Sequence, residues 1–118
     1  MNPVIIECAI NGVTSKATNP HVPVEPSEIV ADALGCMEAG AAIIHNHIDR
    51  YGVSVEQAVE RYLEAWRPVL AARPDALLYP TVHFVQGSSI SYEHLLPLAA
   101  AGLRVGLTDP GSVNLGGT

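Results

Sequence analysis

Two histidines at the end of an apolar segment are the residues of this sequence best suited to chemistry. The segment "AAIIHNHI" spans residues 41–48 and places one residue between His45 and His47. Alternate residues of a β-strand share a face, so the two imidazoles would lie side by side. Neutral imidazoles are common zinc ligands, and two on one strand face can bind the same divalent ion. The alternative interpretations are a pair of hydrogen-bonded core histidines and two histidines that contact only solvent in the loop.

Composition and charge restrict the class of protein. The chain has 118 residues, of which 48% are hydrophobic and 15% are charged, as expected for a single compact domain over residues 1–118. Its formal net charge is −6 and its basic residues are not clustered, so we expect no binding to nucleic acid. No apolar run approaches the roughly 20 residues of a membrane helix, and the N-terminus has no signal pattern. We therefore expect a cytoplasmic protein without membrane contact, with Cys8 and Cys36 as reduced core residues.

Strand-like and helical patterns alternate along the chain. Apolar, β-rich segments occur at residues 4–10, 41–48, 76–84 and 104–109, and amphipathic helical patterns at residues 26–40, 54–73 and 91–102. Repeated βα units with apolar strands predict an α/β fold with a parallel sheet and right-handed crossovers. The sheet can be open and doubly wound, or it can be the first half of a (β/α)8 TIM barrel, which typically has about 250 residues. In both architectures ligands bind at the carboxyl ends of the strands.

Individual residues indicate where the helices begin and end. Pro26 suits the first turn of the first helix. Ser54 and Gln57 have the spacing of a capping box for the second helix, and Ser91 is expected to cap the third. Pro68 is expected to bend or end the second helix, because proline removes a helical hydrogen bond.

Polar residues near the ends of the other strands are further candidates for a site. Asn11 can contact a substrate or form an ordinary Asn-Gly turn. Thr81 and His83 share a face of the third strand, where His83 can bind a metal, support a ligand or be a satisfied loop histidine. Asp109 can orient a metal-bound histidine, contact substrate or cap a turn.

Outside these strand ends, other polar residues carry weaker signals. Ser112 and Asn114 lie in a Gly-rich tail, where they can bind a carboxylate or phosphate through side chains and backbone amides. Glu7 is either an interior carboxylate or the partner of a basic residue. His21 and His94 are expected at the surface.

Three motifs together resemble the beta-keto acid cleavage enzyme family. They are "NPHVPV" before the first helix, "EAGAAIIHNHIDR" around the histidines and "DPGSVNLGG" near the end of the chain. The resemblance covers nearly all of this chain and about half of a family member. Two positions depart from the family pattern: Thr14 stands where a close family member has a catalytic glutamate, and Pro80 begins the segment that replaces a Ser-Thr-Gly-Gly turn.

The resemblance implies a fold, a metal and a reaction. Family members are (β/α)8 barrels that hold a divalent metal, usually zinc, through two histidines and a late glutamate. They exchange a beta-keto acid with acetyl-CoA, giving acetoacetate and a new CoA ester. On this basis we expect His45 and His47 to be the metal ligands. If a complete barrel forms, we expect Asn11, Thr81 and Asp109 to be catalytic residues near the substrate. From their place in the Gly-rich tail, we expect Ser112 and Asn114 to bind substrate.

The resulting functional hypothesis is a zinc-dependent beta-keto acid cleavage enzyme with acetyl-CoA as co-substrate. A metal-binding half-barrel or binding module without catalysis is one alternative, and another metal-dependent lyase or aldolase is a second. The expected partners are a small 3-oxo acid and a CoA thioester. In a half-barrel the inward side chains of Ala9, Ile43, Tyr79 and Leu107 would lack opposing layers. We therefore expect a homo-oligomer or association with the remaining barrel half.

Overall fold

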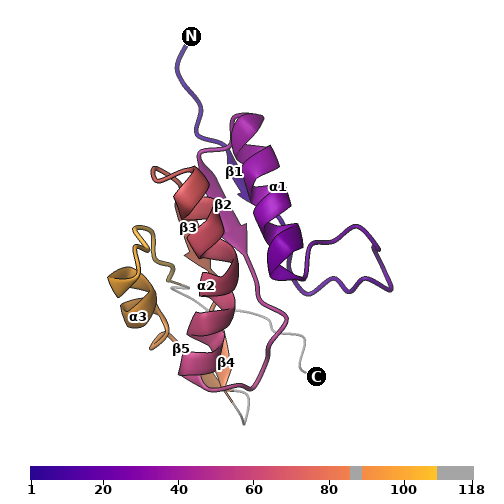
Figure 1. Cartoon of the computed structure of the whole chain (residues 1–118), viewed down its shortest axis with the longest axis vertical. Coiled ribbons are helices and arrows are strands. Elements are labelled where there is room, and N and C mark those ends of the chain that lie inside the picture. Colours follow the sequence, from indigo (N-terminus) through magenta and orange to yellow (C-terminus); the bar gives the residue numbers. More distant parts are fainter. Residues whose placement is uncertain (86–88, 109–118) are drawn as a thin grey trace.

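The fold is built on a three-stranded parallel sheet (Figure 1). The computed structural model describes residues 1–85 and 89–108 of the chain. The strands are β1 (Glu7–Ala9), β2 (Ile43–Asn46) and β3 (Leu77–Pro80), and their order in the sheet is β1-β2-β3. Because all three strands are parallel, their carboxyl ends lie at the same edge of the sheet.

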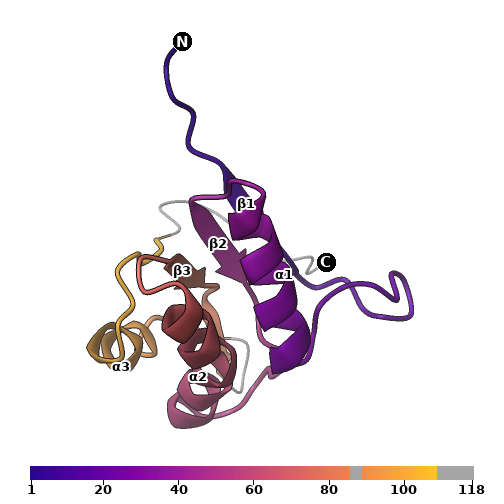
Figure 2. The ribbon, with the colours of Figure 1, turned by 45° about the horizontal axis from the view of Figure 1, so that its top comes forward.

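Two helices cover one face of this sheet. The helices α1 (Pro26–Glu38) and α2 (Val55–Ala72) pack against each other, and Figures 1 and 2 show both in front of the strands. A doubly wound sheet carries helices on both faces, whereas a (β/α) barrel places its helices on the outer face only. The predicted α/β class is therefore confirmed, and the described crossovers are consistent with part of a barrel. The half-barrel itself stays a prediction.

The buried core lies between the sheet and the two helices. Exposure alternates along β2: Ile44 and Asn46 are buried, whereas Ile43 and His45 are only partly buried. This alternation confirms the predicted division of the strand into two faces. The helices contribute Ile29, Ala33, Met37, Val59, Tyr62, Leu63, Trp66 and Val69 to the core.

A buried hydrogen bond ties β2 to α2. The indole nitrogen of Trp66 donates to the side-chain oxygen of Asn46 at 2.8 Å. Asn46 is 1% exposed and Trp66 is 2% exposed, so neither group can exchange its partner for solvent. A buried polar group costs free energy when it has no partner, so this bond makes an asparagine acceptable in the core.

We expect Trp66→Phe to lower the free energy of unfolding by about 1–3 kcal/mol, because it leaves the Asn46 oxygen buried without its donor. Urea unfolding followed by circular dichroism measures the change. The double variant Trp66→Phe/Asn46→Leu is the matched control, since replacing both polar partners by apolar groups costs less than removing one. An unchanged urea midpoint for Trp66→Phe would contradict the prediction.

The third strand is shorter than the sequence pattern predicts. One strand is predicted over residues 76–84, but β3 ends at Pro80. Proline has no amide hydrogen with which to continue a strand ladder. The next amide, that of Thr81, donates instead to the hydroxyl of Tyr62 at 3.2 Å. Thr81 therefore follows the end of a strand rather than lying within one.

A short antiparallel hairpin takes the place of the rest of that strand. In it β4 (His83–Val85) pairs with β5 (Ser89–Ser91). The prediction that Ser91 caps a helix is therefore wrong, because this residue ends β5. The helix α3 (Leu95–Ala100) covers only part of the predicted range 91–102.

The predicted fourth strand does not form in the described part of the chain. The pattern predicts a strand over residues 104–109, but the described residues of this segment have no strand pairing. The guanidinium of Arg104 donates to the carbonyl oxygens of Pro74 and Ala76 at 3.2 and 3.3 Å, which holds the segment near the start of β3. Gly106 lies in the middle of the segment, and an interior glycine weakens a strand.

The second helix begins as predicted but does not end as predicted. The Ser54 hydroxyl accepts from the Gln57 amide at 3.2 Å, and the Gln57 side chain accepts from the Ser54 amide at 3.1 Å, so the capping box is confirmed. Pro68 lies inside α2, which continues to Ala72, so the expectation that it ends the helix is wrong. Packing of the apolar face outweighs the single hydrogen bond that proline removes. No helix of the described residues is long and apolar enough to cross a membrane.

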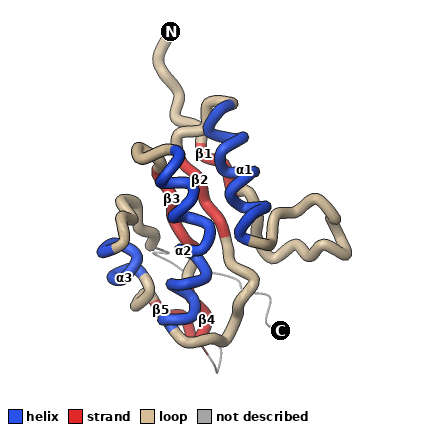
Figure 3. Tube along the Cα trace, viewed as in Figure 1, coloured by secondary structure: helices blue, strands red, loops and turns tan. Residues whose placement is uncertain are grey.

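The first strand is also shorter than the predicted range 4–10. Pairing begins where the carbonyl oxygen of Ile6 accepts from the Ala42 amide at 2.8 Å. Val4 and Ile5 are 82% and 76% exposed, and Figure 3 shows this N-terminal segment as a loop that stands away from the sheet. Figure 3 also shows the long loop that connects β1 to α1 beside the carboxyl end of β1.

Candidate functional site

The two predicted metal ligands lie next to each other at the carboxyl end of β2. His45 pairs in register with Ala9 of β1 and Tyr79 of β3, and His47 follows directly after the strand. The centroids of the two imidazole rings are 5.0 Å apart, and the ring planes are at 80°. The side chain of Asn46, between them in sequence, is buried on the helix-covered side, so the histidines occupy the opposite face.

The protonation of these imidazoles suits a divalent metal. Burial lowers the pKa of His45, and burial together with the neighbouring His45 lowers the pKa of His47 to about 4. Both rings are therefore neutral at pH 7, which is the form that binds zinc. The Nδ1 atom of His47 is buried and has no hydrogen-bond partner among the described residues. An unsatisfied buried nitrogen is costly, and coordination would satisfy it, so the residues present fit a metal.

Tyr79 is the closest aromatic neighbour of His45. Its ring stacks on the imidazole with centroids 4.4 Å apart and planes at 29°. Its carbonyl oxygen lies 3.3 Å from His45 Nδ1, and its hydroxyl donates to the carboxylate of Glu7. Sequence reasoning predicts Tyr79 only as an inward-facing residue, because the contact with His45 depends on the register between β2 and β3.

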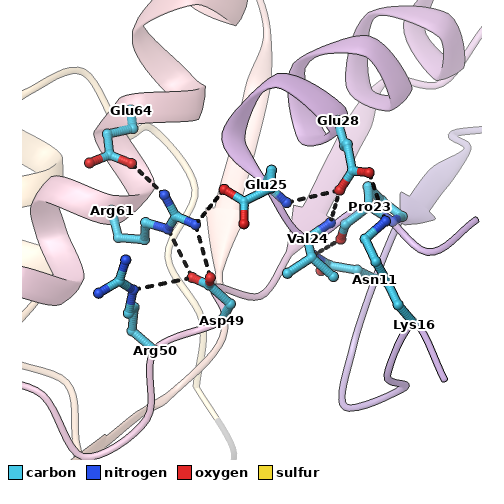
Figure 4. Close-up of polar contacts among 10 residues, drawn as sticks. All are labelled: Asn11, Lys16, Pro23, Val24, Glu25, Glu28, Asp49, Arg50, Arg61 and Glu64. Atoms are coloured by element: carbon cyan, nitrogen blue, oxygen red, sulfur yellow. Dashed lines mark hydrogen bonds and ion pairs between the residues drawn. The ribbon is translucent and has the colours of Figure 1, made fainter. Parts of the chain in front are cut away.

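Asn11 holds the backbone next to His47. Its amide nitrogen donates to the carbonyl oxygens of Pro23 and His47 at 2.9 and 3.1 Å. Its side-chain oxygen accepts from the His47 amide at 2.6 Å. The Asn11 side chain therefore connects the end of β1, the long loop and the end of β2, as Figure 4 shows in part. The predicted contact of Asn11 with substrate stays a prediction.

An open hollow lies on the sheet face that the helices leave uncovered. Its volume is about 450 Å³. Its lining residues are Glu7, Ile43, His45, Tyr79, Thr81 and the segment Val105, Gly106, Leu107 and Thr108. The structure thus brings Thr81 and His45 to the same hollow. The catalytic role of Thr81 and the metal-binding role of His45 stay predictions. Asp109, Ser112 and Asn114 lie outside the described residues.

The remaining histidines have different surroundings. His21 is exposed, as expected, but His94 is 0% exposed, so the expectation that it lies at the surface is wrong. The Nε2 of His94 donates to the Thr81 carbonyl oxygen at 2.9 Å and its ring lies against Tyr62, whereas its buried Nδ1 has no hydrogen-bond partner among the described residues. His83 is also buried, with its Nε2 at 2.9 Å from the carbonyl oxygen of Val53. His83 is therefore a satisfied histidine of β4.

An ion-pair cluster lies just beyond the histidines. The guanidinium of Arg61 on α2 contacts both carboxylate oxygens of Asp49 at 2.8 and 2.9 Å, and it also pairs with Glu25 at 3.1 Å and Glu64 at 2.7 Å (Figure 4). Hydrogen bonds from Arg61 lower the pKa of Asp49. The cluster therefore joins the start of α1, the loop after β2 and the middle of α2.

A complete metal site is not present in the described residues. Within residues 1–85 and 89–108, no group of three or more His, Cys, Asp or Glu side chains is arranged to hold a metal ion. A zinc site with an open position needs three protein ligands. The two histidines would therefore supply part of a ligand set.

Comparisons with known proteins agree with the resemblance in sequence. A family model described as beta-keto acid cleavage enzyme matches residues 3–117. A 3-keto-5-aminohexanoate cleavage enzyme from Acetoanaerobium sticklandii is 33% identical over 118 residues, which are 99% of this chain and 42% of the relative. A protein of the same name from Fusobacterium nucleatum is 30% identical over 120 residues, 99% of this chain and 43% of the relative. The chain thus spans less than half the length of these curated relatives.

Proposed function

The chain belongs to the beta-keto acid cleavage enzyme family, and from that premise we propose that it forms part of a metal-dependent enzyme that cleaves a 3-oxo acid. The observation that carries the proposal is the neighbouring pair His45 and His47, which shares the uncovered sheet face at the carboxyl end of β2. Active sites of (β/α)8 barrels lie at this end of the strands. The relatives are named for a 3-keto acid, which supports the same substrate class here.

His45 and His47 would hold the metal, with zinc preferred and other divalent ions accepted. Bound there, the ion would supply a Lewis acid that takes up negative charge on a carbonyl oxygen of the substrate. Asn11 fixes the backbone of His47 through its hydrogen bonds to the His47 amide and carbonyl groups. Thr81 lines the same hollow as His45 and offers a hydroxyl to the substrate.

The proposed reaction exchanges acyl groups between two substrates. The bond between C2 and C3 of the 3-oxo acid breaks, and its acyl group passes to the thiol of CoA. The acetyl group of acetyl-CoA joins the two-carbon acid fragment and gives acetoacetate. The hollow beside His45 has a volume of about 450 Å³, within the range of small-molecule sites.

We expect a chain that extends over the length of the relatives to release acetoacetate from acetyl-CoA and at least one 3-oxo acid. The assay uses a panel of 3-oxo acids whose side chains differ in length and charge, and it follows acetoacetate directly. A metal chelator should abolish the reaction, and added zinc should restore it. Absence of CoA-dependent acetoacetate release across the panel would refute the proposed reaction.

A second candidate is a metal-binding module without catalysis. It is favoured by Thr14, which stands where a close family member has a catalytic glutamate. The two candidates are separated by the same assay. Zinc binding by the extended chain without acetoacetate release would support the module.

A further inference from the structure

Tyr79 contacts the imidazole of His45 through both its backbone and its ring. The carbonyl oxygen of Tyr79 lies 3.3 Å from Nδ1 of His45. A carbonyl oxygen can only accept a hydrogen bond, so this contact requires the proton of the neutral imidazole to be on Nδ1. The stacked Tyr79 ring, with centroids 4.4 Å apart, restricts the orientation of the imidazole plane.

Glu7 fixes the Tyr79 ring in turn. The Tyr79 hydroxyl donates to the Glu7 carboxylate, so the tyrosine on β3 reaches across β2 to a residue of β1. Burial and the neighbouring Glu7 raise the pKa of Tyr79 to about 12, so the hydroxyl keeps its proton at neutral pH. All three side chains line the hollow on the uncovered sheet face. A tyrosine anchored at both its carbonyl and its hydroxyl has little freedom to leave the imidazole.

We infer that Tyr79, held by Glu7, is a positioning residue that fixes His45 in one tautomer and one orientation, with Nε2 left as the metal-binding atom. The inference rests on the proposed metal site, but it concerns groups of this chain alone. Nδ1 is the only His45 ring atom with a hydrogen-bond contact among the described residues. Partners that orient a metal-binding histidine typically change metal affinity by about 10–100-fold when they are mutated.

The first test needs no metal. Long-range proton–nitrogen NMR spectra of the metal-free protein at neutral pH report which nitrogen of each histidine carries the proton. We expect Nδ1 of His45 to be protonated and Nε2 to be unprotonated. Tyr79→Leu removes the ring and should give averaged or broadened signals for His45. Tyr92→Leu, at a tyrosine 39% exposed between β5 and α3, is the matched control and should leave them unchanged.

The second test is the affinity for Zn²⁺, measured by competition with a chelator. We expect Tyr79→Leu to bind Zn²⁺ about tenfold more weakly than the unmodified protein. Tyr79→Phe keeps the stacked ring and loses only the bond to Glu7, so it should retain most of the Zn²⁺ affinity that Tyr79→Leu loses. Glu7→Gln should resemble Tyr79→Phe, and Tyr92→Leu should match the unmodified protein.

The outcomes separate this inference from the proposed function. An Nε2 proton on His45 in the unmodified protein, or unchanged His45 signals in Tyr79→Leu, would overturn the inference. Failure of the unmodified protein to bind Zn²⁺ would overturn the proposed metal site, and the NMR result would then decide the positioning role alone. If Tyr79→Leu does not fold, the His45 tautomer in the unmodified protein decides the inference, because an Nδ1 proton supports it and an Nε2 proton overturns it.

Discussion

Replacing His45 by alanine is expected to remove most of the bound metal. It is also expected to lower the activity of the extended chain by more than about 100-fold. The described residues contribute only two neighbouring imidazoles to the proposed site, so the substitution deletes half of that contribution. Changes to residues that merely support a metal ligand already cost about 10–100-fold, and loss of the ligand should cost more. Elemental analysis of protein purified without a chelator or an affinity tag measures the metal directly.

The controls for this prediction are other histidines of the chain. His47→Ala should lose metal to a similar extent, because its ring lies beside that of His45. His21→Ala should keep the metal, because His21 is exposed in the loop before α1. Equal metal contents in the His45→Ala and His21→Ala proteins would show that the pair on β2 is not a metal site.

The 118-residue chain on its own is expected to associate at micromolar concentration. The sheet face opposite α1 and α2 has no helix against it in the described part of the chain, and it carries the partly buried Ile43, Tyr79 and Leu107. In the described sheet β1 and β3 each pair on one side only, which leaves backbone groups free for another chain. Burial is worth about 25 cal/mol per Å² of apolar surface, so covering a few hundred Å² favours association by several kcal/mol before the entropy cost.

Sedimentation velocity of the isolated chain tests this prediction. Ile43→Lys places a charge on the uncovered face and should shift the distribution toward smaller species. Leu96→Lys is the matched control, because Leu96 is 79% exposed on α3, away from the sheet, and should not change the distribution. A monodisperse monomer that unfolds cooperatively would contradict the half-barrel interpretation and favour an open sheet.

The sequence predicts most of the first two βα units because their signals are local. The capping box of Ser54 and Gln57, and the alternation that separates His45 from Asn46, depend only on neighbouring residues. Helix and strand periods therefore indicate these features without knowledge of the fold.

The region after α2 is harder to predict because several weak local signals compete there. Pro80 marks the end of β3, but its neighbours have the apolar, β-rich composition of a continuous strand. His94 has a polar side chain on a short helical pattern, which indicates the surface. Its burial depends on an acceptor from Thr81, and no local pattern predicts that contact.

In the candidate site, too, the local features can be predicted from the sequence and the contacts between distant strands cannot. The two histidines can be found from their spacing alone, since a strand places alternate residues on one face. The contacts of Tyr79 with His45 and Glu7 join three strands and follow from the register of the sheet. Register between distant strands is set by packing of the whole core, so these contacts appear only in the structure.

The bond between Trp66 and Asn46 has a further consequence for the histidines. A shift of β2 by one residue relative to its neighbours would exchange its two faces. His45 would then enter the apolar core, and Asn46 would lose the indole and move to the uncovered face. The indole of Trp66 can donate to Asn46 in only one alignment of β2. This contact on the helix-covered face therefore determines which side chains of β2 line the hollow on the opposite face. A designer who grafts this His-x-His segment onto another parallel sheet should therefore transfer the asparagine and its tryptophan with it.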